Sequence, residues 1–500
     1  MRISRERALG LASAVTFSLS ALFSSGHVIA EDGPAESWKQ HLLSEADKKL
    51  NGTEGLSFIA LPLTGPGIDQ SINADAVMNP GSVMKLLTTY AALEILGPTF
   101  TWDTRFYTDG ELKDDTLHGN LYVRFGGDPK LDQERVWSML QELKGMGLKH
   151  IIGDLILDGS YFHLPQGVPH FVDNGNNPYA PFLVEPSPYL TNFNLQQFQV
   201  RADERGTRAW SSPEIAGVTI DNQVEMLETG SCQGRNRFDW HPQKTANGYV
   251  VRVKGKLAKG CRTTAYFSLM PAEYFTAGLI RGLWEDMGGE ITGRDRLAVT
   301  PEDARLMVVS TSADLATTVR DINKWSNNVM ARQLLLTIGA ERRKDDSTDD
   351  RTAGIAAITN WLRSEDIDTR GLVIDNGAGL SRDARISARQ GAHILSHIWS
   401  SRYASDLISS LSMTGMDGTM YRRLRDSGLR GEGRFKTGSL ENVRSVAGFT
   451  RDENHNVWAV VGIINNTPAW NGQAVLDRAI YTLYFDPPVG RSLSHSTIQP

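Results

Sequence analysis

Residues 80–97 read PGSVMKLLTTYAALEILG, a largely apolar stretch that begins at Pro80-Gly81 and ends at Gly97-Pro98. Glycine and proline at both ends are typical of helix boundaries, so the stretch predicts a buried helix over residues 82–96. Ser82 and Lys85 stand at its beginning, three residues apart. Side chains at this spacing lie on one face of a helix about one turn apart, so we expect the hydroxyl and the amine to meet.

Such a pair could supply a nucleophile and its base. A serine hydroxyl is a weak nucleophile until a base takes its proton. A lysine can act as that base once burial or a neighbouring cation lowers its pKa. The positive end of the helix would stabilise a developing anion. The pair alone is a weak signal, because by composition a Ser and a Lys three apart occur about once in a few hundred residues.

Two further motifs follow along the chain. Ser326-Asn327-Asn328 lies inside the helical stretch Leu315 to Leu336 or at a break in it, where a polar helix face is the simpler interpretation. Lys436-Thr437-Gly438-Ser439 lies on a predicted strand, where a glycine often marks the close approach of a ligand or another backbone. Its lysine and hydroxyls could bind a carboxylate, although a surface turn would explain the motif equally well.

Composition limits the class of protein. With 500 residues we expect two or three domains. The formal net charge of −6 argues against a nucleic-acid partner, because phosphate binding requires a basic surface. Two cysteines are too few for a disulfide-dense scaffold or a four-cysteine zinc site.

The N-terminal residues predict export. Three arginines among the first seven residues precede an uncharged, mostly apolar stretch over 8–23, and Val28-Ile29-Ala30 fits a signal-peptidase site. We therefore expect residues 1–30 to be a cleaved signal peptide, with an uncleaved membrane anchor as the alternative. No later run of 18 apolar residues follows, so we expect no transmembrane anchor in the mature chain. In an oxidising compartment Cys232 and Cys261 could form a disulfide, and two free buried thiols are the alternative.

The predicted secondary structure changes character twice along the chain. Short β-type runs punctuated by Gly, Asp and Pro predominate from about 100 to 300, and we interpret residues 99–299 as an inserted β-rich region with two subdomains. Helical patterns return after residue 310, and strands are predicted at Arg434 to Lys436, Arg444 to Thr450 and Val457 to Ile464. A final helix is predicted over Gln473 to Tyr484, and residues 491–500 form a polar tail.

The order of the three motifs points to a family. Ser-x-x-Lys, Ser-x-Asn and Lys-Thr-Gly, in this order and in an exported chain, are the set of the penicillin-recognising serine enzymes. From about residue 50 to 485 the chain resembles the class C low-molecular-mass penicillin-binding proteins, which are periplasmic D-alanyl-D-alanine carboxypeptidase/endopeptidases. The resemblance also rests on Gly126-Gly127-Asp128-Pro129, on residues 153–158 (GDLILD), 375–382 (DNGAGLSR) and 415–419 (GMDGT), and on the long stretch between the first two motifs.

The resemblance implies an α/β (α+β) transpeptidase-type, β-lactamase-like fold with an antiparallel sheet flanked by helices. The catalytic domain would be split into residues 31–98 and 300–490, which meet in space. The resemblance also implies that the enzyme acts on peptidoglycan stem peptides in the periplasm and binds β-lactams, without metal or organic cofactor. The oligomeric state stays open.

Roles follow residue by residue from the same resemblance. Ser82 would be the acylated nucleophile, Lys85 its base, and Ser326 the proton relay to the leaving amine. Asn328 would hydrogen-bond the substrate amide and orient Lys85. The strand Lys436-Thr437-Gly438-Ser439 would bind the terminal carboxylate, with Lys436 supplying charge and helping to keep Lys85 neutral. Backbone N–H groups of Ser82 and Ser439 would form the oxyanion hole.

Arg382, with Glu441 nearby, could pair with the free carboxylate of a meso-diaminopimelate side chain, and an ion pair without contact to substrate is the alternative. A serine β-lactamase and a non-catalytic wall-binding protein are the competing functions. His393 and His397 are spaced for a metal but have no evident third ligand, so a surface or packing role is expected.

Overall fold

The computed structural model describes residues 34–165, 167, 171, 177–232, 238–467 and 469–488. The predicted signal peptide, residues 1–30, and the polar tail, residues 491–500, lie outside these ranges. Within the described part of the chain, no helix is both long and apolar enough to cross a membrane.

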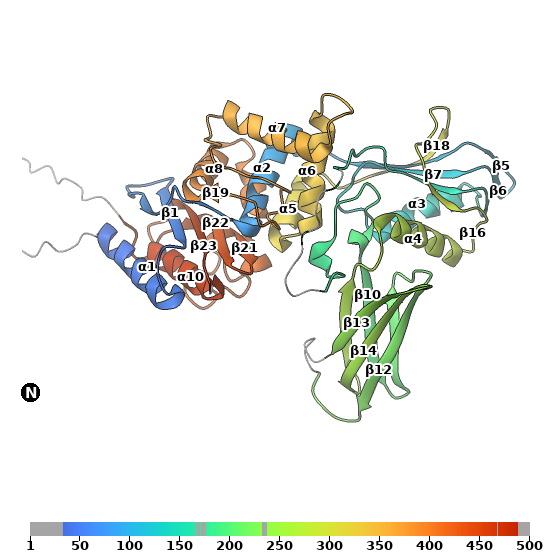
Figure 1. The fold of residues 1–500 in the computed structure, drawn as a ribbon, viewed down its shortest axis with the longest axis horizontal. Helices are drawn as coiled ribbons and strands as arrows, with labels where there is room; N and C mark the ends of the chain where they lie inside the picture. The colour runs from blue at the N-terminus through green and yellow to red at the C-terminus, as the bar shows by residue number, and fades with distance from the viewer. Residues whose placement is uncertain are drawn as a thin grey trace, which may run out of the picture.

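A six-stranded antiparallel sheet is built from both ends of the chain, and it lies at one end of the molecule (Figure 1). Its strand order is β2–β1–β23–β22–β21–β20. The bounds are β1 Leu56–Pro62, β2 Gln70–Ile72, β20 Ser412–Met413, β21 Gly433–Leu440, β22 Val443–Arg451 and β23 Val457–Asn465. Strand β1 pairs with β23 from Leu56↔Ile464 to Pro62↔Trp458, so residues about 400 positions apart are neighbours. A short pair, β3 (Val77–Met78) with β19 (Ile386–Ser387), joins the same two parts of the chain.

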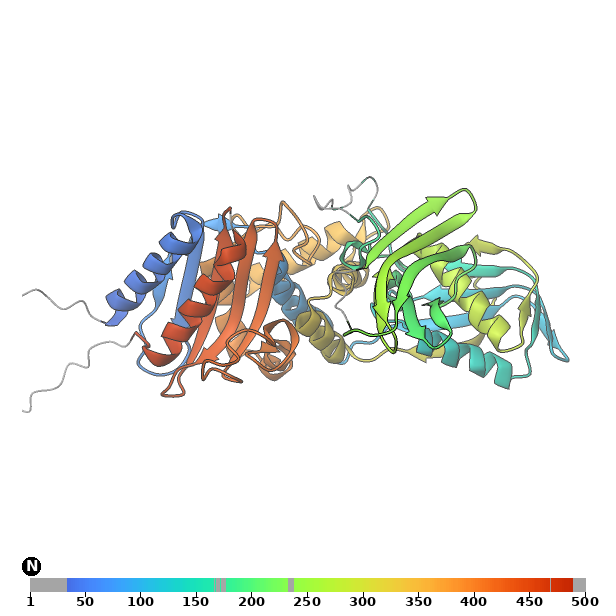
Figure 2. The same cartoon turned by 90° about the horizontal axis from the view of Figure 1, so that it is seen from below.

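Helices cover both faces of this sheet because the strand residues alternate between two apolar cores. Phe58 and Ala60 of β1 pack with α1 (Pro34–Leu50) and α10 (Gly472–Phe485), which lie side by side over one face (Figure 2). Ile59 belongs to the core on the other face, which is covered by α2 (Met84–Leu96) and α8 (Ala388–Ser400). The expected antiparallel sheet flanked by helices is therefore present.

Residues between the two halves of this sheet form separate sheets at the other end of the molecule (Figure 1). One group holds a five-stranded sheet, β17–β9–β7–β4–β18, and a four-stranded sheet, β16–β8–β6–β5, which share an apolar core with α3 (Gln133–Gly145) and α4 (Ala272–Asp286). The strands are β4 Asp103–Thr108, β5 Glu111–Lys113, β6 Thr116–His118, β7 Leu121–Phe125, β8 His150–Ile152, β9 Leu155–Asp158, β16 Glu290–Ile291, β17 Asp295–Leu297 and β18 Arg305–Thr311.

The second group consists of two three-stranded sheets with cores of their own. Their orders are β11–β10–β15 and β12–β14–β13. The strands are β10 Gln196–Asp203, β11 Gly206–Ser212, β12 Val218–Leu227, β13 Asp239–Thr245, β14 Gly248–Ala258 and β15 Arg262–Phe267. A disulfide joins Cys232 to Cys261 at the end of this group.

We propose that the inserted region consists of two subdomains, because its two groups of sheets have separate apolar cores. The end of the insertion differs from the expected one. Strand β18 pairs along β4, from Arg305↔Thr108 to Thr311↔Asp103. The sheet that begins at residue 103 thus ends at Thr311, and we propose that the insertion ends near residue 312 rather than at 299.

The helices on either side of the insertion depart from the sequence pattern at two places. The stretch expected over Leu315 to Leu336 is two helices, α5 (Leu315–Trp325) and α6 (Asn328–Arg342), separated at Ser326. Helix α2 begins at Met84 rather than at Ser82, because residues Gly81–Val83 form a 3₁₀ turn (η1). The remaining helices are α7 Asp350–Ser364 and α9 Ala404–Ser410.

Candidate active site

The first motif brings its serine and lysine together. Ser82 lies in the η1 turn and Lys85 in the first turn of α2, and Lys85 Nζ is 2.9 Å from Ser82 Oγ. Lys85 is fully buried. Its Nζ also lies 2.7 Å from Asn328 Oδ1 and 2.6 Å from the carbonyl oxygen of Ala378. The lysine is thus held by three oxygens, of which Ser82 Oγ is the only hydroxyl.

The surroundings of Lys85 favour its neutral form. Burial is the main cause that places the pKa of Lys85 well below its ordinary value, since desolvation disfavours the ammonium ion. The positive charges of Lys436 and Arg332 lower this pKa further. A neutral amine has two N–H groups and one lone pair. The carbonyl oxygens of Asn328 and Ala378 can accept the two N–H groups, which leaves the lone pair for the Ser82 hydroxyl proton.

The second motif lies in the break between α5 and α6. Ser326 ends α5 in the left-handed conformation, with φ of 56°. Asn327 begins the next helix, because its side-chain oxygen accepts a hydrogen bond from Met330 N at 3.1 Å. Asn328, the first residue of α6, donates from Nδ2 to the carbonyl oxygen of Phe182 at 3.1 Å. The break therefore places Ser326 and Asn328 at one site although a continuous helix would separate them by more than half a turn.

The third motif lies on β21 and contacts the second. Lys436 is fully buried, and its Nζ donates to Ser326 Oγ at 2.7 Å and to the carbonyl oxygen of Thr437 at 2.8 Å. Burial lowers the pKa of Lys436 to about 7. Thr437 Oγ1 donates to Thr419 Oγ1 at 2.8 Å.

Gly438 allows β21 to approach the turn that carries Ser82. An ideal Cβ at Gly438 would lie 2.6 Å from the carbonyl oxygen of Pro80 and 3.0 Å from Ser82 N. One at Gly81 would lie 3.4 Å from Ser439 N. The backbone nitrogens of Ser82 and Ser439 are therefore close together, as an oxyanion hole requires.

A glycine-rich loop closes the other side of Lys85. In the segment 376–379, Ala378 supplies the carbonyl oxygen that contacts Lys85, and Thr88 Oγ1 donates to the carbonyl oxygen of Gly377 at 2.7 Å. Gly379 has a φ of 69°, and a Cβ there would lie only 1.8 Å from the carbonyl oxygen of Gly81. The loop can pack on the η1 turn only with glycine at this position.

A cavity of about 760 Å³ opens over these residues. It is lined by Ser82, Ser326, Asn328, Thr437, Gly438 and Ser439, so the structure brings all the predicted motif residues except the buried lysines to one surface. Arg382 and Glu441 lie at its edge, and Arg382 Nη2 is 3.4 Å from Glu441 Oε2. Both side chains are about half exposed, so the pair lies in solvent at the cavity mouth.

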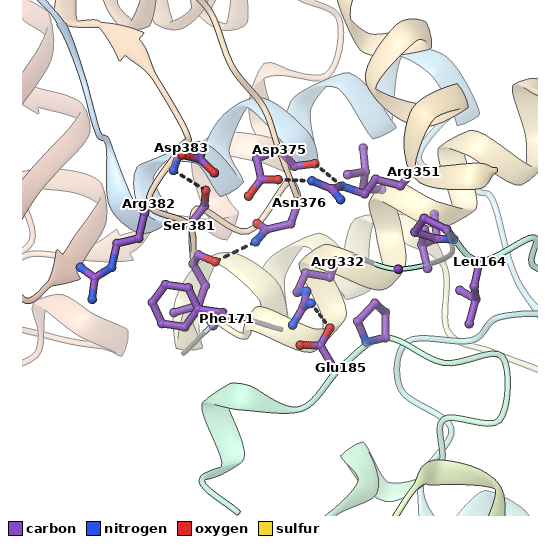
Figure 3. Close-up of a pocket in the computed structure, with 16 residues that line it drawn as sticks. Leu164, Phe171, Glu185, Arg332, Arg351, Asp375, Asn376, Ser381, Arg382 and Asp383 are labelled. Atoms are coloured by element: carbon purple, nitrogen blue, oxygen red, sulfur yellow. Dashed lines mark hydrogen bonds and ion pairs between the residues drawn. The ribbon is translucent and has the colours of Figure 1, made fainter. Parts of the chain in front are cut away.

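A second cavity of about 690 Å³ continues from this edge (Figure 3). Figure 3 shows Arg382 at one end and Leu164 at the other. Two ion pairs line it, Arg332 with Glu185 and Arg351 with Asp375. The cavity thus runs between α6 and residues of the inserted region.

Three contributors to the site were not anticipated from the sequence. They are the Ala378 carbonyl, the Phe182 carbonyl and the Thr419 hydroxyl. Ala378 and Thr419 lie within stretches that carried the resemblance, whereas Phe182 belongs to the insertion and has no motif around it.

His397, one of the two histidines spaced for a metal, has other partners. His397 Nδ1 lies 2.7 Å from Tyr90 Oη, and Nε2 lies 3.1 Å from Glu365 Oε2. Among the described residues, no group of three or more His, Cys, Asp and Glu side chains is arranged to hold a metal ion.

The fold and the convergence of the three motifs define the class of penicillin-recognising serine hydrolases. The chain belongs to the D-Ala-D-Ala carboxypeptidase 3 (S13) family, whose model matches residues 54–481. It is a serine-type D-Ala-D-Ala carboxypeptidase, and the expected family is confirmed.

Similar proteins agree with this assignment. The D-alanyl-D-alanine carboxypeptidase DacB of Haemophilus influenzae is 25% identical over 445 residues, covering 87% of this chain and 91% of that protein. A D-alanyl-D-alanine carboxypeptidase of Actinomadura sp. is 27% identical over 398 residues, covering 74% and 70%. The crystal structure of Haemophilus influenzae penicillin binding protein 4 superposes with a TM-score of 0.70 at 24% identity, covering 88% of this chain and 98% of that one. That protein has also been solved with a β-lactam.

Proposed function

We propose that the enzyme cleaves the terminal D-alanine from peptidoglycan stem peptides, and the corresponding cross-links, through an acyl-enzyme on Ser82. The observation that carries this proposal is the environment of Lys85. A buried amine with two carbonyl acceptors and one hydroxyl neighbour is suited to take the proton of that hydroxyl.

In the acylation step a proton would leave Ser82 on one side of the site and reach the leaving amine on the other. Lys85 Nζ takes the Ser82 proton while Ser82 Oγ attacks the carbonyl carbon of the penultimate D-alanine. The backbone N–H groups of Ser82 and Ser439 hold the oxyanion. When the tetrahedral intermediate collapses, the C–N bond breaks and Ser326 gives its hydroxyl proton to the leaving amine. Ser326 in turn takes up the proton that Lys85 received from Ser82, so that Lys85 is neutral again. Ser326 Oγ lies 2.7 Å from Lys436 Nζ.

Hydrolysis would use the same groups in reverse. Lys85 removes a proton from water, the water oxygen attacks the ester carbonyl, and Ser82 Oγ leaves with the proton. Lys436, Thr437 and Ser439 hold the carboxylate of the terminal residue through charge and hydroxyl groups. Asn328 orients Lys85 and the substrate amide.

The substrate class follows from the family and from the site. A free terminal carboxylate fits the Lys436 strand, and the cavity continues past Arg382 with room for a further side chain. We propose that Arg382 pairs with the free carboxylate of a diaminopimelate residue, which would also allow endopeptidase action on cross-links. The corresponding site of action is the periplasm, reached by the predicted signal peptide.

The test is labelling of the mature chain with a fluorescent penicillin, followed by mass spectrometry, with Ser82→Ala in parallel. A stable adduct on Ser82 that the variant lacks, together with release of D-alanine from a stem pentapeptide by the parent chain only, supports the proposal. Penicillin that disappears from solution without an adduct indicates a β-lactamase instead. If the chain forms no adduct and also does not consume penicillin, it is a non-catalytic wall-binding protein.

Arg382 has a separate test. Arg382→Ala should lose more activity on diaminopimelate peptides than on lysine peptides, because only the former carries the additional carboxylate. Equal losses would show that Arg382 and Glu441 are an ion pair without contact to the substrate.

A further inference from the structure

Lys324 is a second buried lysine beside the active site, and none of the three motifs includes it. It lies in the last turn of α5, two residues before Ser326, and is 6% exposed. Its Nζ donates to Asp417 Oδ2 at 2.5 Å and to the carbonyl oxygen of Leu411 at 2.7 Å. Both acceptors belong to the segment that follows α9, so the lysine joins this segment to α5.

The segment 412–419 is fastened to the end of α5 by further contacts. Asp417 Oδ1 accepts a hydrogen bond from Met413 N at 2.7 Å, which folds the segment into a turn. Ser412 Oγ donates to the carbonyl oxygen of Lys324 at 3.3 Å and accepts from Thr419 N at 3.1 Å. A Cβ at Gly418 would lie 2.6 Å from the same Lys324 carbonyl oxygen, so the two backbones are in direct contact.

Thr419, the last residue of segment 412–419, lies at the catalytic cavity. It lines that cavity, is exposed, and its Oγ1 is 2.8 Å from Thr437 Oγ1. Thr419 Oγ1 also lies 3.3 Å from Ser412 Oγ, a longer contact than the one with Thr437, so the Thr419 proton can turn from Ser412 to a shorter contact with a third acceptor. In the proposed function that acceptor is the terminal carboxylate of the substrate.

We infer that Lys324 is a positioning residue of this active site: paired with Asp417, it fixes segment 412–419 against α5, so that Thr419 and Thr437 together donate to the substrate carboxylate. The inference rests on the proposed function. It adds Thr419 as a substrate-binding residue and Lys324 and Asp417 as the residues that place it.

Helix α5 keeps another anchor when Lys324 is replaced. Asn323 Nδ2 donates to Ser410 Oγ at 2.9 Å and to Thr89 Oγ1 at 3.1 Å. Loss of the Lys324 side-chain contacts should therefore loosen the turn around Asp417 without releasing α5, while the Lys324 carbonyl oxygen keeps its contacts with Ser412 and Gly418. Ser326 should keep its place, and so should Thr437, because β21 is paired with β22. Thr419 should not.

The experiment compares steady-state kinetics of Lys324→Met, Asp417→Asn and the double variant on a D-Ala-D-Ala peptide, in the mature chain. Because the carboxylate is held equally in the ground state and the transition state, we expect KM to rise about 10-fold with kcat within about 2-fold of the parent. The double variant should be no worse than Lys324→Met, since both changes break one interaction. Lys130→Met is the matched control. It removes the ion-pair partner of Asp321, which lies on α5 like Lys324, and should leave KM unchanged.

Thr419 provides a second measurement that does not depend on the buried pair. Thr419→Val should raise KM as Lys324→Met does, and Thr419→Ser should restore it, because only the hydroxyl is required. A fall in kcat equal to the rise in KM, or a Thr419→Val variant with the parent KM, would overturn the inference. Ser82→Ala is measured alongside: turnover by that variant would refute the proposed function itself.

Discussion

Replacing Gly438 with alanine would put a methyl group between the Lys-Thr-Gly strand and the turn that carries Ser82. An ideal Cβ there lies 2.2 Å from Ser445 Oγ and 2.6 Å from the carbonyl oxygen of Pro80, whereas real Cβ contacts are essentially never below 3.0 Å. Ser445 cannot simply rotate away, because it is buried and donates to the same Pro80 oxygen at 2.5 Å. The strand and the turn must separate by at least 0.4 Å at Pro80, from 2.6 to 3.0 Å.

This separation acts on the oxyanion hole and on the distance between Ser82 and the bound peptide. A misplacement of about 1 Å between reacting groups costs about 100-fold in rate. For roughly half that displacement we expect a loss of about 10- to 100-fold in acylation rate, or about 1.4 to 2.7 kcal/mol of transition-state stabilisation. Stopped-flow acylation by a chromogenic penicillin, with kcat/KM on a D-Ala-D-Ala peptide, measures it.

Two further variants isolate the cause. Gly145→Ala, at the end of α3, adds a methyl group with nothing within 4 Å and should react as the parent does. Gly438→Ala combined with Ser445→Ala removes the nearest contact, so it should recover part of the rate, and the remaining loss reports the Pro80 contact. Acylation of Gly438→Ala at the parental rate would refute the reasoning, since the close approach would then not matter to the chemistry.

Three other outcomes follow from the described contacts. Asn328→Ala removes an acceptor 2.7 Å from Lys85 Nζ and should lower kcat about 100-fold, as measured by D-alanine release, with little change in the melting temperature. In the proposed mechanism Lys85 must be neutral, so kcat/KM should rise with pH through the lowered pKa of Lys85. Lys436 must be charged, so kcat/KM should fall again above the Lys436 pKa of about 7. A flat pH profile of kcat/KM would contradict both roles. Replacing Cys232 and Cys261 together with serine should lower the free energy of unfolding by about 3 kcal/mol in urea titrations. It should not alter kcat, because none of the described residues between the two cysteines lines the catalytic cavity.

Lys436 also predicts how stability depends on pH. Its pKa is about 7 in the folded chain and that of an ordinary lysine in the unfolded chain, so between these values the unfolded chain binds more protons. The free energy of unfolding should therefore rise with pH across this window, by about 1.4 kcal/mol per pH unit from this group. Lys436→Met should reduce the slope by that amount, and an unchanged slope in urea titrations would exclude the shifted pKa.

Much of the site could be predicted because its parts are local. The contact between Ser82 and Lys85 follows from the pitch of a helix, and the three-residue spacing survives although the turn at Ser82 is 3₁₀ rather than α. The order of the three motifs along the chain then indicated the family. The break at Ser326 has no reliable local signal, because only the polar Ser-Asn-Asn run marks the left-handed residue inside the helical pattern.

The sequence by itself indicated the class of enzyme through the order of its three motifs, and it predicted the contact between Ser82 and Lys85, because that contact depends on a spacing of three residues. Only the tertiary structure decided which groups complete the site. The pairing of β1 with β23, the Ala378 carbonyl on Lys85 and the Thr419 hydroxyl on Thr437 all join positions at least 18 residues apart. Such contacts depend on sheet register and on the packing of loops, and two of the three involve backbone groups. Every residue type carries the same backbone groups, so their partners become evident only when the chain is folded.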